Sequence, residues 1–525
     1  MLSLILQSQE ALLTLILGSS LLSCSVLLSF VKKHGFTSAL LYPFRQLKQW
    51  LNAYLFIIDA PRIIQDGYDK SHGKVFVVDS PDVRYHLVTN PKLIDEIDRA
   101  PNDVLSLQAA AKVLLRPEHS MHNFSWFEKR GVDSAPLPKT VRTLLRNELP
   151  FILPKTRVAN SQIMDEMLGG TGKQPHISKV VRECVAQTNA IAFFGEELAN
   201  DRDFMIAAED FIDKTVYIAE AARLLPGFVG TAVVKFLESH FSSQHIIFNA
   251  LEPVAQRRID EQELARQGQI VPEHKDCIQY IMEQTMDSKP SQCEITGPWA
   301  AGRIVHELMA LWFGAVHTMA MATTFAIRDV CMHPEYLQAL RAEIESPAYL
   351  KWEATGTGMP LLDSFLKESA RLNPLDNVST RRKALKPFTM SNGTRVETGE
   401  WLATPLAAML KDSANWSEPN EFHGFRHVAP AHLASLEENG FKSPEPGKAC
   451  LITDVSKWQT WGTGRMACPG RFYAVAGIKQ IFSLVITKYD VSISDRCAPR
   501  KYSWRTCNVP RSDLPIVLAP RGGAK

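Results

Sequence analysis

The 525-residue sequence has little net charge: 58 lysines and arginines stand against 56 acidic residues, which leaves +2. This balance argues against a disordered chain and against nucleic-acid binding. The nine cysteines are scattered, and no two of them form a C-x-x-C pair. A disulfide framework or a zinc site is therefore not expected, and we expect the protein to face a reducing compartment. The chain also lacks internal repeats, low-complexity segments and a glycine-rich dinucleotide fingerprint.

Charge is absent altogether from Ala11 to Val31, and Lys32 and Lys33 follow. As a helix these residues would span about 31 Å, enough to cross the hydrocarbon core of a bilayer. A cleaved signal peptide is the alternative, but its basic residues would precede the apolar run and a small-residue cleavage site would follow it. We expect residues 1–33 to form an uncleaved signal anchor, with a helix at about 11–31, and residues 34–525 to be one catalytic domain on the cytosolic side.

The remaining pattern is mainly α with a minor β part. Residues 74–90 alternate as in a β-hairpin, and Pro91 is placed to open a helix. Helical periodicity dominates from about residue 95 to 380. A second hairpin is expected around the turn at Asn392 and Gly393, followed by a short helix.

Two apolar stretches leave alternatives open. Leu224 to Leu237 is too short to span a membrane, so it is either a surface element that dips into a bilayer or an ordinary buried loop and helix. Leu308 to Ile327 has the length of a transmembrane helix. Gly314, His317 and several threonines make it costly in lipid, so we predict a long central helix of the core.

A lone cysteine is most often a small core residue, but the neighbours of Cys468 differ from those of a core position. Pro469 suits the first position of a helix, which would place Cys468 at the N-cap, where the helix dipole favours a thiolate. Arg465 adds a nearby cation. The apolar stripe of that helix comprises Phe472, Val475, Ile478, Phe482 and Val485. Room for a large flat partner is left by Gly462, Gly464 and Gly470.

This loop resembles the cysteine loop of the cytochrome P-450 haem-thiolate monooxygenases, F-x-x-G-x-R-x-C-x-G. Trp461 stands where that family has Phe, while Gly464, Cys468 and Gly470 match. Arg465 lies one residue ahead of the usual arginine, which binds a haem propionate. The resemblance implies haem b with Cys468 as axial ligand, in a pocket to which Trp461, Gly462, Gly464, Arg465, Pro469 and Gly470 contribute.

A second element resembles the E-x-x-R pair of the same family. Glu368 and Arg371 lie on one helix face in "KESAR", and Arg426 in "EFHGFRHVAP" would complete a structural network with them. Two arginines follow in "STRRKAL", Arg381 and Arg382. The family's layout implies that one of them binds a haem propionate, and we expect this residue to be Arg382.

A third element, "FGAVHTMAMATT", resembles the oxygen-binding segment [A/G]-G-x-[D/E]-T of the central helix. Gly314 and Thr318 match its ends, and His317 replaces the usual acid. Thr318 would position a water for proton delivery, and His317 could pass protons to it. The alternative is that His317 packs between helices and bonds a backbone carbonyl.

The resemblance implies a P-450 fold, with haem between the central helix and the cysteine-loop helix, and monooxygenation of a small apolar substrate. Electrons would come from NADPH through a separate flavoprotein reductase, because the segment after Cys468 is too short for a flavin domain. That reductase would dock on a basic face formed by Arg465, Arg471 and Lys479. The expected location is the endoplasmic reticulum membrane, with a single span and no oligomer required.

The closest pattern is that of microsomal members which filamentous fungi use in secondary metabolism, with terpenoid, indole-terpenoid or polyketide substrates. One rival function is a haem-thiolate isomerase or dehydratase that needs no NADPH. Another is a haem protein without catalysis, such as a carrier or membrane scaffold. Thr318 argues against the first, because such enzymes need no proton relay.

Overall fold

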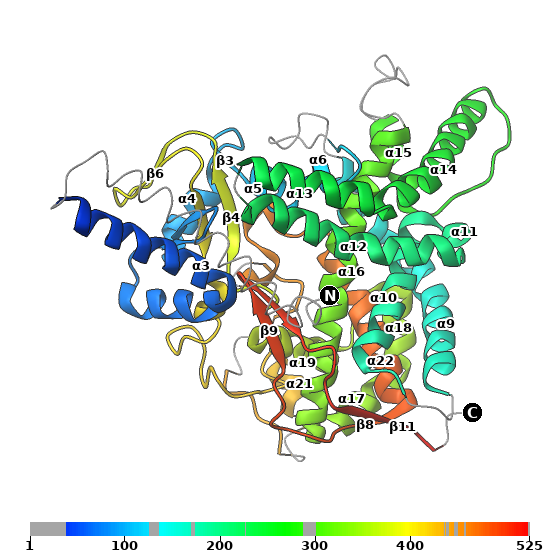
Figure 1. Cartoon of the computed structure of the whole chain (residues 1–525). Coiled ribbons are helices and arrows are strands. Elements are labelled where there is room, and N and C mark those ends of the chain that lie inside the picture. Colours follow the sequence, from blue (N-terminus) through cyan, green and yellow to red (C-terminus); the bar gives the residue numbers. More distant parts are fainter. Residues whose placement is uncertain are drawn as a thin grey trace.

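The computed structural model describes residues 38–124, 136–169, 174–225, 227–286, 301–434, 436, 440–445, 450–455 and 458–522. The expected membrane helix at residues 11–31 lies outside these ranges. The structure is mostly helical, at 61%, with a minor β part. The five-stranded sheet lies at one side together with α3 and α4, and most of the other helices lie at the opposite side (Figure 1). The expected mainly α class with a minor β part is therefore confirmed.

A five-stranded sheet forms the β part, in the order β1-β2-β7-β4-β3. β2 and β7 pair in parallel, and the other neighbours are antiparallel. The predicted first hairpin is β1 with β2, and Pro91 opens α4 at its first turn, capped by the Asn90 side chain. The strands are β1 (Phe76–Asp79), β2 (Arg84–Leu87), β3 (Leu105–Ser106), β4 (Ser379–Ala384) and β7 (Trp401–Thr404).

Three two-stranded antiparallel sheets complete the β part. The pair β5 and β6 is the hairpin predicted around Asn392 and Gly393, and the short helix α20 follows β7 as expected. The other two pairs are formed by the C-terminal segment. Their bounds are β5 (Phe388–Thr389), β6 (Arg395–Val396), β8 (Tyr489–Ile493), β9 (Lys501–Trp504), β10 (Cys507–Pro510) and β11 (Ile516–Pro520).

The helices before the central one carry the N-terminal half of the chain. They are α3 (Ser38–Ser71), α4 (Pro91–Arg99), α5 (Leu107–Leu115), α6 (Pro117–Ser120), α7 (Pro136–Lys139), the π-helix η1 (Thr140–Leu144), α8 (Leu145–Asn147), α9 (Leu149–Leu168), α10 (Ile177–Phe194), α11 (Glu196–Ala199), α12 (Arg202–Leu224), α13 (Gly227–His240), α14 (Ser243–Arg266) and α15 (Cys277–Met286).

The central helix is α16 (Ala301–Met332), and the rest follow it: the 3-10 turn η2 (Pro334–Tyr336), α17 (Leu337–Ile344), α18 (Pro347–Thr355), α19 (Pro360–Leu372), α20 (Leu406–Met409), α21 (Pro430–Ala434), the 3-10 turns η4 (Gln459–Trp461) and η5 (Gly464–Met466), and α22 (Arg471–Lys488).

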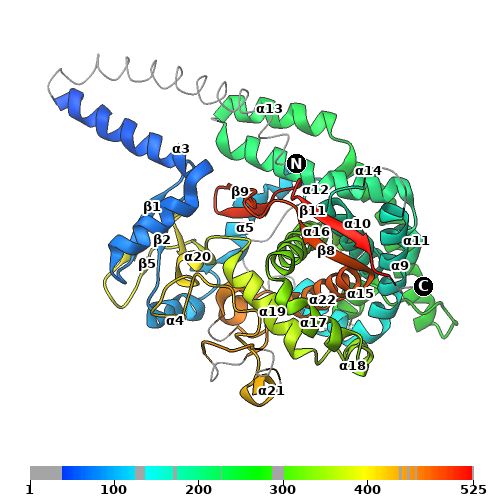
Figure 2. The ribbon, with the colours of Figure 1, turned by 90° about the horizontal axis from the view of Figure 1, so that it is seen from below.

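The stretch predicted as a core helix lies within α16, which packs against α10, α14, α19 and α22. Figure 2 shows α16 with α10 and α22 beside it. Among the described residues α16 is the one helix long and apolar enough to cross a membrane, and half of its most apolar window is buried in the molecule. This burial fits a core helix, since α16 contributes to the largest hydrophobic cluster through residues such as Leu308, Trp312 and Ile327.

The other apolar stretch, Leu224 to Leu237, ends α12 and forms most of α13. Gly230 and Val234 are the buried residues of α13. Phe228 is 81% exposed and Phe236 is 59% exposed. The sequence was compatible with either a surface element or a buried loop and helix. In the structure α13 lies on the surface, with two aromatic rings toward solvent.

Candidate active site

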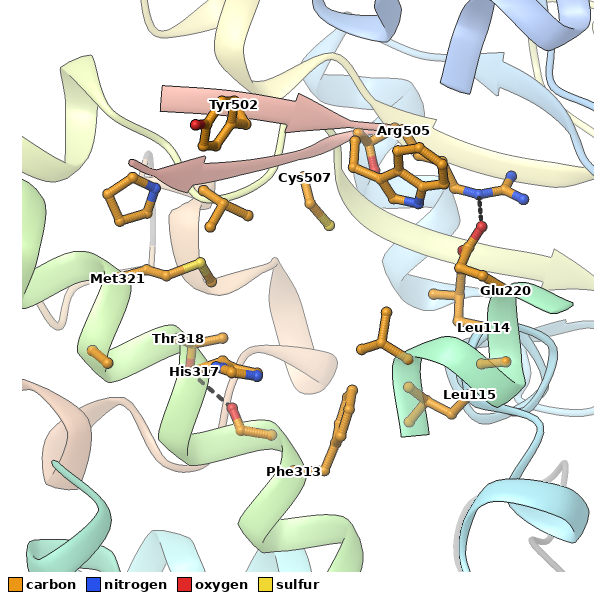
Figure 3. A pocket seen from close by; sticks show the side chains of 18 of the residues that line it. Leu114, Leu115, Glu220, Phe313, His317, Thr318, Met321, Tyr502, Arg505 and Cys507 are labelled. Atoms are coloured by element: carbon orange, nitrogen blue, oxygen red, sulfur yellow. Dashed lines mark hydrogen bonds and ion pairs between the residues drawn. The ribbon is translucent and has the colours of Figure 1, made fainter. Parts of the chain in front are cut away.

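A partly enclosed cavity of about 530 Å³ lies between α16, α12, α5, β4 and the hairpin of β9 and β10. Its volume is within the range of small-molecule sites. Figure 3 shows Phe313, His317 and Thr318 of α16 on one side, and Tyr502, Arg505 and Cys507 of the hairpin on the other.

Two residues predicted on α16 shape this cavity. A Cβ atom built on Gly314 would have no heavy atom within 4 Å, so the helix surface there borders open space. Thr318 lies one turn further along, and its Oγ1 donates to the Gly314 carbonyl at 2.8 Å. This is the bond that threonines commonly make within helices. Because Thr318 is exposed to the cavity, its oxygen lone pairs remain available to a water or ligand there.

His317 also lines the cavity, and it reaches a carboxylate that the sequence pattern did not indicate. Its Nε2 lies 3.3 Å from Oδ1 of Asp213 on α12, and Asp213 Oδ2 lies 3.5 Å from Arg182 Nη1 on α10. Burial of Asp213 opposes ionisation, but the nearby His317 and Arg182 outweigh burial and hold the pKa of Asp213 below its ordinary value. The nearest partner of the His317 side chain is thus the Asp213 carboxylate and not a backbone carbonyl.

Arg182 extends this group toward the surface. Its Nε lies 3.1 Å from Glu209 Oε2, and its side chain is 25% exposed. Burial, together with the neighbouring carboxylate of Glu183, raises the pKa of Glu209 to about 7. A line of titratable side chains therefore leads from the cavity at His317 to the molecular surface.

Cys468 lies in the loop before α22. Its N–H donates to the Trp461 carbonyl at 2.7 Å, and Arg471 Nη1 donates to the Cys468 carbonyl at 2.9 Å. The N-cap of α22 is Gly470, so the prediction that Cys468 is the N-cap is wrong by two residues. Pro469 and Gly470 continue the loop because the helical hydrogen bonds begin only at Arg471.

The protonation of Cys468 also differs from the expectation of a thiolate favoured by the helix dipole. Burial raises the pKa of the Cys468 thiol, and this outweighs the N–H groups of Gly470 and Arg471 and the Arg471 charge, which act in the opposite direction. The unligated thiol is therefore protonated at neutral pH. A bound metal ion would displace that proton.

The glycines of the loop permit its path. Gly462 and Gly464 have φ values of +78° and +56°, in the left-handed region that favours glycine. A Cβ on Gly464 would also lie 2.8 Å from Asp98, and one on Gly470 would lie 3.2 Å from a Val141 methyl group. Trp461, the residue that departs from the resembled pattern, is partly buried and donates from Nε1 to the Ile452 carbonyl at 2.7 Å.

The two candidate propionate ligands, Arg382 and Arg465, lie near the same end of α4. Arg382 Nη2 donates to Asp98 Oδ1 at 3.0 Å, and Arg465 donates to the Ala100 carbonyl. Arg381 points elsewhere: it lines the cavity and donates to Asp376 and Thr506. Adjacent residues of a strand face opposite sides, which separates the two arginines of β4.

The structure brings Glu368, Arg371 and Arg426 together in a fully buried cluster. Arg371 donates to both Glu368 carboxylate oxygens at 2.8 Å, and Arg426 Nε lies 3.1 Å from the same oxygens. All three side chains have zero exposed area. Glu445 adds a second carboxylate, at 3.3 Å from Arg426, that the sequence pattern did not indicate.

The prediction that Lys479 belongs to an exposed basic face is wrong. Lys479 has 5% of its side chain exposed, and its Nζ lies 2.6 Å from Asp363 Oδ1 on α19. The inward face of α22 holds Lys479 in an ion pair, so this residue cannot meet a partner protein. Cations that do lie near Arg471 are Arg142 and Arg146, both exposed.

Comparison with known proteins agrees with this geometry. The family model described as Cytochrome P450 matches residues 50–516. Cytochrome P450 monooxygenase ptmQ of Penicillium ochrochloron is 26% identical over 495 residues, covering 90% of each chain. Ent-kaurene oxidase P450-4 of Gibberella fujikuroi is 24% identical over 464 residues, covering 85% of this chain and 84% of the oxidase.

Solved structures share the fold at lower identity. The heme domain of cytochrome P450DA has a TM-score of 0.64 at 14% identity, covering 88% of this chain and 94% of that domain. The retinoic acid-bound cyanobacterial CYP120A1 has a TM-score of 0.60 at 15% identity, covering 87% and 94% of the two chains.

Proposed function

We propose that this chain, which belongs to the cytochrome P450 family and is a monooxygenase, oxidises an apolar small molecule of secondary metabolism. The electrons would come from NADPH through a separate reductase. The observation that carries this proposal is the cavity that borders Gly314 and Thr318 of α16 and is lined largely by apolar side chains. The similarity to fungal monooxygenases supports the choice of metabolism.

The residues of the cysteine loop fit haem b. The Cys468 sulfur accepts from the N–H groups of Gly470 and Arg471, the kind of contact that tunes a thiolate ligand. Trp461, Gly462, Gly464 and Pro469 would surround the group. Haem with a thiolate ligand supplies the activation of dioxygen when bound.

Arg382 and Arg465 are proposed to hold the propionates. Both are cationic and lie at the end of α4, where their present acceptors are Asp98 and the Ala100 carbonyl. A propionate would compete with these acceptors, and bidentate pairing with a carboxylate suits the guanidinium group.

The proposed proton path begins at Thr318, whose hydroxyl can hold a water in the cavity. His317 lies next to it on α16, and its Nε2 is 3.3 Å from Asp213 Oδ1. Arg182 and Glu209 continue the line to the surface. A carboxylate from α12 would thus act beside His317, where the resembled segment carries its acid on the central helix itself.

The Glu368, Arg371 and Arg426 cluster is proposed to be structural. Besides Glu368, Arg371 donates to the carbonyls of Leu410 and Pro419, which ties the loop before α21 to α19. This bonding holds the segment that leads to the cysteine loop, and the cluster itself contacts no part of the cavity.

The reductase is proposed to dock near the cysteine loop. Arg142, Arg146 and Arg465 are exposed, and Arg471 lies close to the first two. Arg146 and Arg471 both lie over the Phe472 ring, at 3.9 and 4.4 Å from its centre. This surface offers positive charge to an acidic partner, and electrostatic complementarity speeds such encounters.

A single N-terminal span in the endoplasmic reticulum membrane, residues 1–33 followed by a catalytic domain at 34–525, remains our proposal for localisation. The charge-free run followed by Lys32 and Lys33 supports it. The exposed rings of Phe228 and Phe236 on α13 support a second contact with the bilayer.

The principal experiment measures the reduced carbon monoxide complex and NADPH-dependent turnover in the presence of a reductase. The wild-type complex should absorb near about 450 nm, as haem-thiolate proteins do. Cys468→Ala should lose this band and all turnover, whereas Cys497→Ala, an exposed cysteine, should keep both. A band that survives Cys468→Ala would exclude Cys468 as the ligand. Turnover that needs no NADPH would favour the isomerase or dehydratase, and haem binding with no turnover would favour the non-catalytic protein.

A further inference from the structure

The cavity wall formed by β4 and the hairpin of β9 and β10 contains buried nitrogen donors without an acceptor. Among the described residues, Trp504 Nε1, Arg381 Nε and Arg505 Nη2 have no hydrogen-bond partner, and all three residues line the cavity. Buried polar atoms in folded proteins are nearly always paired. Donors left unpaired on one wall of a cavity therefore indicate that a ligand supplies the acceptor.

The charges of this wall are already balanced within the protein. Arg381 Nη2 lies 2.6 Å from Asp376 Oδ2. Arg505 lies 2.7 Å from Asp82 and 2.9 Å from Glu220, and Figure 3 shows the contact of Arg505 with Glu220. A ligand carboxylate would therefore meet these acidic groups as well as the cations. The wall suits a neutral acceptor, such as a carbonyl, ether or hydroxyl oxygen.

The rest of the lining is mostly apolar. Figure 3 shows Leu114, Leu115, Phe313 and Met321 around the cavity, and Val216 also lines it. Apolar side chains favour a hydrocarbon body by removing its surface from water. The polar lining residues of α16 are His317 and Thr318, which the proposed function assigns to proton delivery, and Thr324, whose hydroxyl donates to the Ala320 carbonyl. Polar residues of α10 also line the cavity: Ser178, Lys179 and Arg182.

We propose that the substrate is an apolar molecule that already carries a neutral oxygen acceptor, and that Trp504 Nε1 and Arg381 Nε donate to that oxygen. The hydrogen bonds would fix one end of the substrate at the hairpin and leave another part of its hydrocarbon body beside Thr318. This inference rests on the proposed function, because it takes the cavity to be the substrate site. A site built to bond an oxygen discriminates against the analogue that lacks it, since its buried donors then stay unpaired.

The class of reaction that precedes this enzyme follows from the same chemistry. A substrate with an oxygen function on an otherwise apolar skeleton is the product of an earlier oxygenation or of a cyclisation that retains oxygen. A bare hydrocarbon would leave the two donors without an acceptor.

Equilibrium dialysis of the haem-loaded full chain tests the inference with two probes of the same skeleton, 5α-androstan-3-one and 5α-androstane. The ketone should bind the wild-type protein about tenfold more tightly, the ratio that corresponds to one or two net hydrogen bonds. Trp504→Phe removes the donor and keeps a ring, so it should remove most of this preference while hydrocarbon affinity stays within about twofold.

Two further variants sharpen the test. Arg381→Lys keeps the charge beside Asp376 but loses Nε, and it should also reduce the preference for the ketone. Trp458 has a buried indole nitrogen without a partner too, but it does not line the cavity, so Trp458→Phe is the matched control and should leave the preference unchanged.

Equal binding of both probes to the wild-type protein, or an equal loss for both in Trp504→Phe, would overturn the inference. These outcomes are separate from a failure of the proposed function. A ketone preference in a protein whose turnover does not depend on NADPH would overturn the proposed reaction and leave the acceptor site standing.

Discussion

Asp213 shows that a carboxylate from a separate helix can lie beside His317, although the sequence pattern has no acid at that point. The resembled oxygen-binding segment has an acid directly before its threonine, and this chain has His317 there. Asp213 lies 3.3 Å from the imidazole, but it comes from α12. Arg381 and Arg382 show the converse, since two neighbours of the same type contact different groups, Arg381 with Asp376 and Arg382 with Asp98. At this scale, function depends on where each side chain points.

The first prediction concerns Thr318 and His317. Thr318→Ala should still bind haem and substrate and consume NADPH, but it should release more peroxide and form about tenfold less product, because its hydroxyl no longer holds the proton-delivering water. His317→Ala and Asp213→Asn should shift the ratio of product to NADPH in the same direction. Thr323→Ala, a buried threonine on the same helix that bonds the Met319 carbonyl, is the control. An unchanged ratio in His317→Ala would make His317 structural.

The second prediction concerns the pH dependence of stability at Glu209. Burial and Glu183 raise the pKa of Glu209 to about 7 from an ordinary 4.5, so the folded state holds this proton more tightly than the unfolded state does. Stability from this group is therefore intact below about pH 4.5 and falls as the pH rises to about 7. Glu209→Gln should lack this fall, so its melting temperature should exceed that of wild type more at pH 8 than at pH 5.

Thermal unfolding at both pH values measures this difference. Glu166→Gln, at an exposed position of α9, should follow the wild-type protein. A constant difference between Glu209→Gln and wild type across the range would show that Glu209 does not titrate in it.

Networks of ion pairs and hydrogen bonds connect helices, strands and loops that are far apart in the sequence. Glu368 of α19 accepts from both Arg371 and Arg426, and Arg371 donates to backbone carbonyls of the loop between α20 and α21. Asp82, Glu220, Arg223 and Arg505 do the same for the turn after β1, the end of α12 and the hairpin of β9 and β10. Each network joins elements that the chain separates by many residues.

The third prediction is that Glu368→Ala yields little or no haem-loaded protein. Removal of one partner strands two buried arginines, at a cost of about 3–5 kcal/mol, which is a large part of a typical stability of about 5–15 kcal/mol. Asp59→Ala breaks the exposed pair with Arg62 and should leave the stability and the haem content nearly unchanged, because solvent screens such a pair. Haem content per folded chain is the measurement. Full haem content and normal activity in Glu368→Ala would contradict a structural role for the cluster.

At the scale of the whole molecule, the surface position of α13 bears on how the protein contacts a membrane. Val234 is buried, but the rings of Phe228 and Phe236 remain exposed. Exposed aromatic rings on a short helix are typical of an interfacial membrane contact. Two separate contacts bind a membrane more firmly than either alone, because the second becomes intramolecular once the first is made.

The fourth prediction therefore concerns membrane release. Deletion of residues 1–33 should leave part of the protein bound to vesicles in a sedimentation assay, and the added changes Phe228→Ser and Phe236→Ser should release most of the rest. Ile270→Ser, at another fully exposed apolar position, should release none of it. Complete release by the deletion alone would show that α13 makes no membrane contact of its own.

Features that depend on neighbouring residues were predictable from the sequence. Periodicity located the long central helix, and alternation with turn residues located both hairpins, because helix faces and turns follow from residues a few positions apart. The cysteine loop and the Glu368–Arg371 pair were identified by their resemblance to motifs of a known family. The contact of Arg426 with that pair came from a resembled motif and is present in the structure.

Features that join distant segments became visible in the folded chain alone. It buried Lys479 against Asp363, moved the start of α22 to Arg471, brought Asp213 to His317 and set β7 between β2 and β4. It also placed Trp504 and Arg381 on one cavity wall. Local patterns carry no information on these contacts, because packing of the whole chain selects which faces of separate elements meet, and burial then changes the pKa values and partners of the charged groups between them.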